Sequence, residues 1–295
     1  MCELRATSRT RLYGIIGDPV EHSLSPLMQN AALEATGLDA VYLAFRVEPS
    51  SLHMALEGFK AIGLSGFNVT IPHKVAVMRH LDDREETAAT IGAANTVVVH
   101  NGRLIGHNTD GAGALAALRE SGVEPSGMRV LLLGSGGAAR ALAFTLAEIA
   151  ESVTILNRTG SKAQTLAEDV RRATGATSVT GGDANPSTLL KAAARSNMVV
   201  NATSVGMNPH AGETPIVREL LRPDMVVFDI VYSPLETRLL QDAGRVGAKC
   251  VNGLTMLVWQ GALAFKLWTG AEAPVSAMRE ALTTVLRARP DRGPD

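Results

Sequence analysis

The stretch RVLLLGSGGAAR, from Arg129 to Arg140, decides how this 295-residue chain is expected to fold. An apolar run leads into Gly134-Ser135-Gly136-Gly137-Ala138-Ala139, which matches the pattern G-x-G-x-x-A. In that pattern the glycines allow a tight turn and a close approach of the backbone to a pyrophosphate, whose charge is met by the N-terminus of the following helix. A plain turn between a strand and a helix would look similar. The order of strand, glycine loop and helix favours a dinucleotide site with Gly134, Gly136, Gly137 and Ala138 at the cofactor.

The end of the next expected strand indicates which dinucleotide would bind. NAD-binding proteins tend to carry Asp or Glu there, which binds the ribose 2′-hydroxyl. This chain has Asn157, Arg158 and Thr159 instead, and Lys162 follows one turn later. Because the planar guanidinium of an arginine can stack on adenine and bind a 2′-phosphate, the sequence predicts NADP as the cofactor. If no glycine loop preceded them, Arg158 and Lys162 would be interpreted as solvated charges in a surface loop.

On both sides of this motif, apolar strand-like runs alternate with amphipathic segments. Alternation of this kind is typical of a mostly parallel sheet covered by helices, so two α/β units are expected, one before and one after Asp110. In the first unit Ser25 is predicted to be the N-cap of a helix that ends at Gly37. Asn101-Gly102 predicts an antiparallel hairpin. TMLVWQGALAFKLWTG and VSAMREALTTVLRA predict two final helices, and ARPDRGPD a frayed end.

Composition excludes several classes of function. The chain is 46% hydrophobic and 19% charged, with a formal net charge of −1, so neither a nucleic acid nor an anionic membrane is an expected partner. Cys2 and Cys250 are the only cysteines, and the N-terminus has no apolar signal segment, which together favour a cytoplasmic protein. The histidine spacing predicts no bound metal.

The stretch NVTIPHK, from Asn68 to Lys74, contains the candidate catalytic group. Asn68 and Thr70 are two apart on an expected strand, so they face the same side, while Val69 and Ile71 are expected to pack on the other face. Lys74 follows Pro72 at an expected helix start. Hydride transfer from an alcohol needs a group that moves the hydroxyl proton, and a lysine can do this. Asp110 could hold that ammonium in place, or it could be only the N-cap of the helix that follows.

Nine motifs in one order over nearly the whole chain resemble the shikimate dehydrogenase family. They are GDPVEHSLSP, NVTIPHK, IGAANT, GHNTDG, GSGGAAR, NRT, NATSVGM, YSPLETRLL and NGLTMLVWQGALAFKLWTG. The resemblance implies NADP-dependent, reversible reduction of 3-dehydroshikimate to shikimate in chorismate and aromatic amino-acid biosynthesis. It also implies an α/β fold of two domains: a mostly parallel substrate domain of residues 1–109 completed by the helices of 254–295, and a Rossmann NADP domain of residues 110–253.

The resemblance also implies roles for individual residues. Lys74 and Asp110 would be the catalytic pair. The substrate carboxylate would be bound by Ser23 and Ser25, with Tyr232 closing that end, and the ring hydroxyls by Asn68, Thr70, Asn95, Asp110 and Gln260. Near the nicotinamide half of the cofactor would lie Thr203, Ile230, Gly253 and Met256. Without the resemblance, Ser23 would be an ordinary loop hydroxyl and Gln260 a polar position on a mostly buried helix.

The chain departs from the family pattern at three positions. Thr255 stands where glycine is common and adds a β-branched side chain near the expected nicotinamide. Ile230 stands where methionine is frequent, and His107 where an acid is common, so His107 could add a titrating charge. None of the three removes a proposed catalytic group.

Other interpretations remain open at this point. A relative that oxidises quinate tends to use NAD and to carry an acidic residue after the second Rossmann strand, where Asn157-Arg158-Thr159 stands here. These three residues do not distinguish a shikimate enzyme from one that acts on aminoshikimate. A non-catalytic ligand sensor would not need Lys74 and Asp110, and a different two-domain NADP oxidoreductase would not need the serine pair or Gln260. The small-molecule partner is expected to be a shikimate-like hydroxy acid, and the protein a monomer or homodimer.

Overall fold

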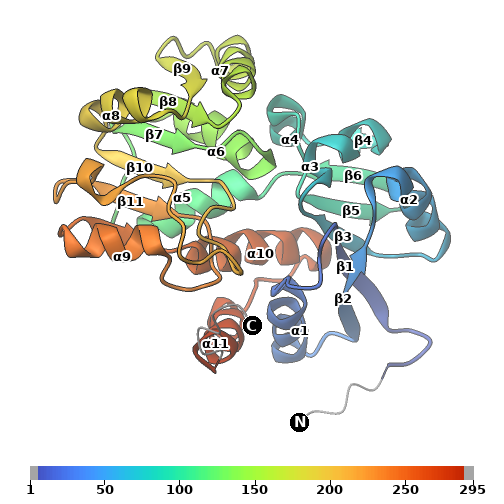
Figure 1. Ribbon diagram of the computed structural model, residues 1–295. Coiled ribbons are helices and arrows are strands. Elements are labelled where there is room, and N and C mark those ends of the chain that lie inside the picture. The colour runs from blue at the N-terminus through green and yellow to red at the C-terminus, as the bar shows by residue number, and fades with distance from the viewer. Residues whose placement is uncertain (1–5, 289–295) are drawn as a thin grey trace. The chain divides into compact units, whose positions relative to one another are not determined.

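A computed structural model describes residues 6–288 (Figure 1). Cys2 and the part of the predicted frayed end beyond residue 288 lie outside the described residues. The chain forms two compact units. The first extends to Thr109 and includes Gln260–Thr284, and the second comprises Asp110–Trp259 and the end of the last helix.

The first unit is built on a six-stranded mixed sheet in the order β2-β1-β3-β5-β6-β4. β1 pairs in parallel with β2 and β3, while β5 is antiparallel to both of its neighbours, β3 and β6. In chain order the elements are β1 (Arg11–Gly17), α1 (Ser25–Thr36), β2 (Ala40–Arg46), η1 (Pro49–Ser51), α2 (Leu52–Ala61), β3 (Gly66–Val69), α3 (His73–Ala76), η2 (Val77–His80), β4 (Asp83–Arg84), α4 (Glu86–Ile91), β5 (Thr96–His100) and β6 (Arg103–His107).

The predicted hairpin joins β5 to β6. Asn101 has φ 50° and Gly102 has φ 73°. A two-residue turn with positive φ at both positions matches the twist of the two strands, and Asn-Gly meets that requirement with little strain. The hairpin prediction is therefore confirmed.

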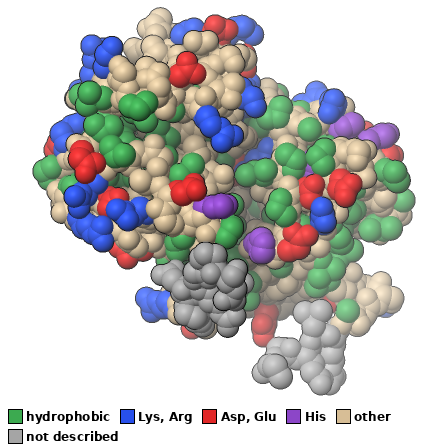
Figure 2. All heavy atoms as spheres, viewed as in Figure 1, with side chains coloured by type: hydrophobic (Ala, Val, Ile, Leu, Met, Phe, Trp, Pro, Cys, Tyr) green, Lys and Arg blue, Asp and Glu red, His purple; other side chains and the backbone are tan. Residues whose placement is uncertain are grey.

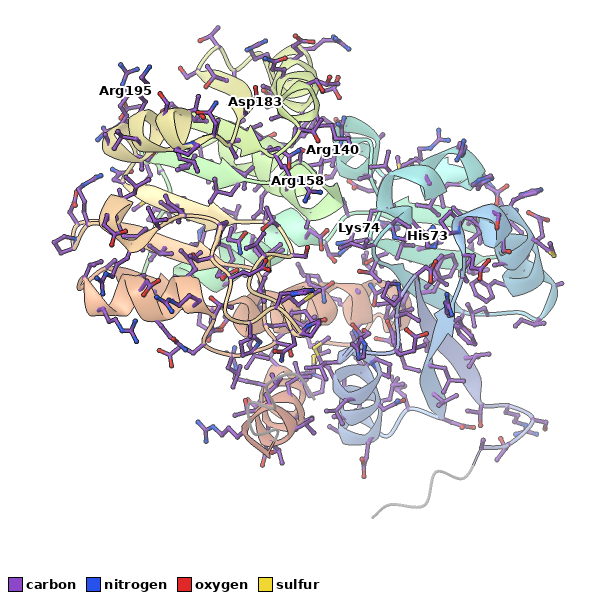
Figure 3. The ribbon with its side chains drawn as sticks, viewed as in Figure 1. His73, Lys74, Arg140, Arg158, Asp183 and Arg195 are labelled. Atoms are coloured by element: carbon purple, nitrogen blue, oxygen red, sulfur yellow. The ribbon has the colours of Figure 1, made fainter. Side chains whose placement is uncertain are left out.

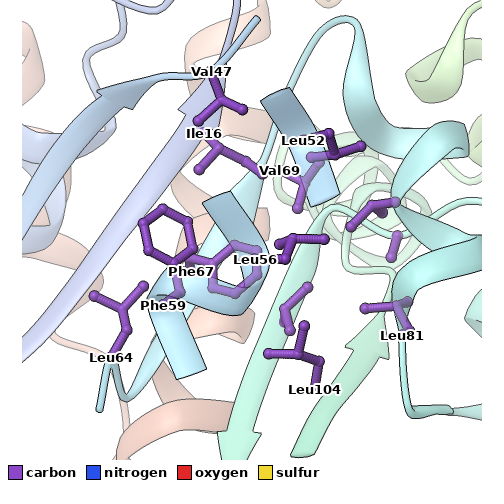
Figure 4. Packing of buried hydrophobic residues seen from close by; sticks show 13 residues of the cluster. Ile16, Val47, Leu52, Leu56, Phe59, Leu64, Phe67, Val69, Leu81 and Leu104 are labelled. Carbon is purple, nitrogen blue, oxygen red and sulfur yellow. The ribbon is translucent and has the colours of Figure 1, made fainter. Parts of the chain in front are cut away.

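The two faces of this sheet have different cores. α2 packs on one face over a cluster that includes Ile16, Leu56 and Phe67, all fully buried (Figure 4). On the other face lies the C-terminal half of α10 (Gly253–Thr269), where Trp268 stacks on Tyr13 with ring centroids 5.4 Å apart. Trp268 also donates its indole N–H to the carbonyl of Val97. α10 thereby covers the face of the sheet on which Asn68 lies.

The second unit contains a parallel six-stranded sheet in the order β12-β11-β10-β7-β8-β9. This is the strand order of a Rossmann fold, so the predicted fold class is confirmed. α5, α6 and α7 lie side by side, while α9 packs against β11 and β12 (Figure 1). The elements are α5 (Asp110–Glu120), β7 (Arg129–Leu133), α6 (Gly137–Ala147), β8 (Ser152–Asn157), α7 (Gly160–Thr174), β9 (Val179–Asp183), α8 (Pro186–Arg195), β10 (Met198–Asn201), η3 (Arg218–Leu220), β11 (Val226–Asp229), α9 (Arg238–Arg245) and β12 (Lys249–Val251), followed by α10 and α11 (Val275–Ala288).

Local predictions for Ser25, Thr70 and Ile71 were wrong. Ser25 is not the N-cap of α1: the N-cap is Leu24, and Ser25 is the first helical residue, whose N–H donates to the Ser23 hydroxyl at 3.3 Å. Ile71 was predicted to pack behind the Asn68 face, but 64% of it is exposed. Because β3 ends at Val69, the alternation of a strand no longer governs the direction of the Ile71 side chain.

On the face that Figure 2 shows, acidic and basic side chains are both scattered over the surface. Within residues 6–288, no helix is long and apolar enough to cross a membrane, and no group of three or more His, Cys, Asp or Glu side chains is arranged to hold a metal ion.

Candidate active site

The polar residues of the first unit gather at one edge of its sheet. In the strand register Asn68 lies beside Thr96, and Thr96 lies beside His107. β3 and β6 end at this edge and β5 begins there, so the residues that follow β3 and β6 and the residue that precedes β5 converge on it. The carboxyl ends of parallel strands are where α/β proteins bind ligands.

The Asn68 amide is held by three hydrogen bonds. The Tyr42 hydroxyl donates to its Oδ1 at 2.7 Å, and its Nδ2 donates to the Asn95 carbonyl at 3.0 Å and the Thr96 hydroxyl at 3.1 Å. Complete burial raises the pKa of Tyr42 well above its usual value, so the phenol stays a donor. An amide oxygen has two lone pairs, which leaves one on Asn68 for a ligand hydroxyl.

Asn95, Thr109 and Gln260 form a second part of the same network. Asn95 Nδ2 donates to the Thr109 hydroxyl at 2.9 Å and to Gln260 Oε1 at 3.3 Å, and the Thr109 hydroxyl donates to the Gln260 carbonyl at 3.0 Å. The structure therefore brings together Asn68, Asn95 and Gln260, three of the predicted site residues. Sequence reasoning missed Thr96 and Thr109, although each sits beside a predicted residue in IGAANT and GHNTDG.

Lys74 lies on α3, at the same edge of the sheet, and its backbone is fixed on two sides. Its carbonyl accepts the Ala94 N–H at 2.9 Å. The preceding residue, His73, is buried and its Nε2 donates to the Val47 carbonyl at 2.6 Å. The Lys74 side chain itself is half-buried; Figure 3 labels it beside His73. Asp110 opens α5 in the second unit and is buried, with 3% of its surface exposed.

The serine residues are placed by the start of α1. Ser25 is buried, and one turn further on Gln29 is 1% exposed. Gln29 Nε2 donates to the Gly261 carbonyl at 2.9 Å, next to Gln260. Its Oε1 is a buried polar side-chain atom without a hydrogen-bond partner. Flipping the amide would set oxygen against oxygen, so the hydrogen bond to Gly261 fixes which atom is left unpaired.

Replacing Gln29 by methionine is expected to leave the protein as stable as before or more stable. An unsatisfied buried acceptor costs about 1–3 kcal/mol, and methionine fills a similar volume without it. Urea unfolding curves of the two proteins measure the difference.

The control for this change is the neighbouring residue, Asn30, replaced by leucine. Both polar atoms of the Asn30 side chain bind the backbone of Tyr42: Nδ2 donates to its carbonyl at 2.9 Å, and Oδ1 accepts its N–H at 2.8 Å. Its loss should therefore destabilise the protein. A Gln29→Met protein destabilised as much as Asn30→Leu would contradict the prediction.

In the second unit the glycine loop has the geometry that a bound pyrophosphate needs. Gly134 has φ 116°, and a Cβ there would lie 2.7 Å from the Ala202 carbonyl oxygen, so this position requires glycine. Gly136 is the N-cap of α6, and a Cβ there would have no neighbour within 4 Å. The loop is therefore tight on the side of the sheet and open above the helix N-terminus.

Beside this loop, Arg158 and Lys162 are exposed at the β8–α7 turn. Neither forms an ion pair with a carboxylate in the described part of the chain. Asp183 is turned to the helix instead: its Oδ1 accepts the Gly160 N–H at 2.8 Å, and a Cβ at Gly160 would lie within 2.2 Å of it. The guanidinium of Arg158 is thus available to a ligand phosphate (Figure 3).

The residues predicted near the nicotinamide follow β10 and β11 or begin α10. Thr203 donates through both its N–H and its hydroxyl to Asn201 Oδ1, at 3.1 and 2.7 Å. A Cβ at Gly253 would lie 2.3 Å from the Ile230 carbonyl, so these two predicted residues are in backbone contact. Met256 is buried. Tyr232 stands two residues beyond Ile230, and burial raises its pKa.

Two of the departures from the family pattern have local explanations. The N–H and the hydroxyl of Thr255 both donate to Asn252 Oδ1, each at 3.3 Å, so Asn252 caps the first turn of α10 and the Thr255 hydroxyl adds to that cap. His107 is half-buried, and desolvation lowers its pKa, which disfavours the additional charge. Thr70, which was expected on the strand with Asn68, follows the last residue of β3, Val69. The roles of the predicted site residues in binding and catalysis stay predictions.

Taken together, these features define a class: a protein of two α/β units, one of them a Rossmann unit with a dinucleotide loop. Three family models match the chain, and their descriptions are a shikimate dehydrogenase substrate binding domain at residues 15–97, a shikimate/quinate 5-dehydrogenase at 116–231 and a shikimate 5′-dehydrogenase C-terminal domain at 253–283. The chain belongs to the shikimate dehydrogenase family.

Individual relatives are similar over almost their whole length. The NADP(+) shikimate dehydrogenase of Thermococcus kodakarensis is 50% identical, covering 94% of this chain and 97% of the relative, and that of Symbiobacterium thermophilum is 48% identical, covering 98% and 100%. A crystal structure of shikimate dehydrogenase in complex with NADP+ is 42% identical with TM-score 0.90, covering 96% of this chain and 98% of that one. The Thermus thermophilus enzyme in complex with NADP(H) and shikimate is 40% identical with TM-score 0.84, covering 94% and 100%.

Proposed function

We propose that this chain is an NADP-dependent shikimate dehydrogenase, an oxidoreductase that interconverts 3-dehydroshikimate and shikimate on the route to chorismate and the aromatic amino acids. The observation that carries the proposal is the polar cluster at the sheet edge of the first unit, where Asn68, Asn95 and Thr109 are buried and hydrogen-bonded. The half-buried Lys74 joins this edge through its carbonyl, which accepts the N–H of Ala94, the residue before Asn95. Such a cluster suits a small substrate that carries several hydroxyl groups.

The chain's own side chains divide the substrate among them. The fixed amides of Asn68, Asn95 and Gln260 offer hydrogen bonds to ring hydroxyls, with Thr70 and Asp110. Because the Asn68 amide has three protein partners, its remaining lone pair points in a set direction, which favours one arrangement of hydroxyls. Ser23 and Ser25 bind the carboxylate through their hydroxyls, with Tyr232 closing that end.

The proton is handled by Lys74. In the reducing direction the Lys74 ammonium gives a proton to the ketone oxygen as the carbon receives hydride, and in the oxidising direction the Lys74 amine takes the hydroxyl proton back. Asp110 is the carboxylate partner that keeps the ammonium oriented. When bound, the nicotinamide supplies or takes the hydride.

The second unit holds NADP through three groups of residues. The glycine loop meets the pyrophosphate with Gly134, Gly136, Gly137 and Ala138. Arg158 binds the 2′-phosphate, helped by Asn157, Thr159 and Lys162. Thr203, Ile230, Gly253 and Met256 surround the nicotinamide end.

We further propose that the enzyme works in the cytoplasm, as a monomer or homodimer.

A panel of substrates and cofactors tests this proposal. Purified protein is given shikimate, quinate or aminoshikimate, each with NADP+ or NAD+, and cofactor reduction is followed at 340 nm. We expect shikimate with NADP+ to have the highest kcat/KM. Quinate with NAD+ is the critical comparison, because a quinate dehydrogenase from Corynebacterium glutamicum in complex with NAD is 34% identical to this chain. A higher kcat/KM for quinate or aminoshikimate would overturn the proposal.

A further inference from the structure

A buried carboxylate stands behind the nicotinamide end of the proposed cofactor site. Asp229 is the last residue of β11 and is completely buried. Its Oδ1 accepts the Asn201 Nδ2 at 2.9 Å and the Val231 N–H at 3.0 Å, and its Oδ2 accepts the Thr237 hydroxyl at 2.6 Å. The carboxylate therefore ties together β10, the loop after β11 and the start of α9.

Asn201 extends this network to the other loop. It is the last residue of β10, and its Oδ1 accepts both the N–H and the hydroxyl of Thr203. Its Nδ2, besides donating to Asp229, donates to the Val205 carbonyl at 3.1 Å. The Thr203 hydroxyl in turn accepts the Val205 N–H at 3.1 Å. Every polar atom of these side chains is used to set the path of the backbone from Asn201 to Val205.

Among residues 6–288, no cation forms an ion pair with Asp229. On α9, Arg238 and Arg245 both pair with Asp242, at 2.8 and 3.1 Å, and on β12 the Lys249 ammonium donates to the Gly122 carbonyl. β10 has no titratable side chain. Desolvation accordingly raises the pKa of Asp229 to about 6, against the lowering effect of its three hydrogen bonds.

An ionised Asp229 is thus a cost to the folded state. The pKa of Asp229 in the folded protein lies above its ordinary value of 3.8. Its contribution to the free energy of unfolding is therefore fully present below pH 3.8, where the group is protonated in both states, and is lost as the pH rises through about 6. A neutral residue at this position would make the folded protein more stable. Because Asp229 precedes Ile230 and binds Asn201, its charge is better explained by a role in the cofactor site.

We propose that Asp229 is a positioning residue which, through Asn201, holds Thr203 and the Ile230–Val231 backbone in the arrangement that receives the nicotinamide end of NADP. This inference rests on the proposed function. Three donors meet an ionised carboxylate, which is an acceptor only. Once protonated, one oxygen becomes a donor, so one of the three bonds is weakened and the loops lose part of their restraint.

Direct binding of NADP+ to Asp229→Asn tests the proposal. Asparagine has the same shape, and its Nδ2 can donate to the Thr237 hydroxyl, but it lacks the charge. We expect the Kd for NADP+ at pH 8, measured by titration calorimetry, to rise about tenfold. The melting temperature of the variant at the same pH should be unchanged or higher. The matched control is Asp224→Asn, because Asp224 is exposed in the same unit and pairs with Arg222.

The pH dependence gives a second readout. The Kd of the natural protein for NADP+ should rise as the pH falls from 8 to 5. Because the 2′-phosphate of NADP+ also titrates, with a pKa of about 6, both proteins should show a pH dependence, and it should be steeper in the natural protein than in Asp229→Asn. If Asp229 acted in folding alone, Asp229→Asn would have a lower melting temperature than the natural protein and the same Kd for NADP+ at every pH. That result would overturn the proposal. Because binding is measured without turnover, the outcome stands even if shikimate proves not to be the substrate.

A second pair of variants covers the case in which Asp229→Asn does not fold. Thr237→Val removes the hydroxyl that donates to Asp229, and Thr237→Ser keeps it. We expect a several-fold weaker Kd for NADP+ with valine and recovery with serine. Equal Kd values for the valine variant and the natural protein would contradict the inference.

Discussion

Replacing Lys74 by alanine is expected to lower kcat for shikimate oxidation about 10²- to 10⁴-fold, the range that positioned acid–base groups contribute. The KM for shikimate should change little, because the ring hydroxyls are assigned to amides that have their own protein partners. Steady-state kinetics at saturating NADP+ measure both constants. Lys74→Arg should also be slow, since a guanidinium stays protonated and cannot take up the hydroxyl proton.

The control for this prediction is Lys60→Ala. Lys60 belongs to the same unit but pairs with Asp82 at 3.0 Å and Glu57 at 3.3 Å on the surface of α2. Its loss should leave kcat unchanged. A Lys74→Ala enzyme that keeps more than about a tenth of the natural kcat would remove Lys74 from the proton transfer and leave it only a binding role.

Replacing Arg158 by alanine is expected to raise the KM for NADP+ about 10- to 100-fold and to leave the KM for NAD+ nearly unchanged. A hydrogen bond to a charged group contributes about 1.5–3 kcal/mol, and only the 2′-phosphate of NADP can make it. Since Arg158 has no carboxylate partner among residues 6–288, its loss should not disturb the fold. Initial rates with each cofactor at saturating shikimate give both KM values.

Arg195→Ala serves as the control for Arg158→Ala. Arg195 ends α8, outside the glycine loop and the β8–α7 turn (Figure 3). Its replacement should change neither KM. If Arg158→Ala raised both KM values equally, the side chain would be acting on the adenine or on the shape of the turn, and the basis for NADP preference would lie elsewhere.

Local sequence signals were sufficient for much of the fold. Gly134 and Asn101-Gly102 are recognisable because the backbone conformation that each adopts is open to few residue types. The apolar runs that became β7 and β10 are recognisable because strands buried on both faces of a parallel sheet are continuously apolar. The cofactor prediction had the same local character, since Arg158 stands at a fixed offset from the glycine loop.

Where a prediction needed more than local information, the sequence was insufficient. Ser25 has the residue type of an N-cap, yet α1 begins one residue earlier than that pattern indicates. Ile71 continues an apolar alternation, but β3 has already ended. In both cases the deciding factor is where the chain enters or leaves the packed element, which neighbouring residues do not specify.

By itself, then, the sequence determined the class of fold and the glycine loop, and it indicated Arg158 as the candidate cofactor-selecting charge and Lys74 as the candidate catalytic group, since each depends on residues within one short segment. Only the tertiary structure decided which side chains meet. The Gln29 side chain donates a hydrogen bond to the Gly261 carbonyl, Asn95 donates one to Gln260, and the buried Asp229 accepts one from Asn201. Burial and hydrogen-bond partnership are properties of contacts between distant segments, and they decide whether a polar residue is an ordinary surface group, a buried positioning group or a group that titrates near neutral pH.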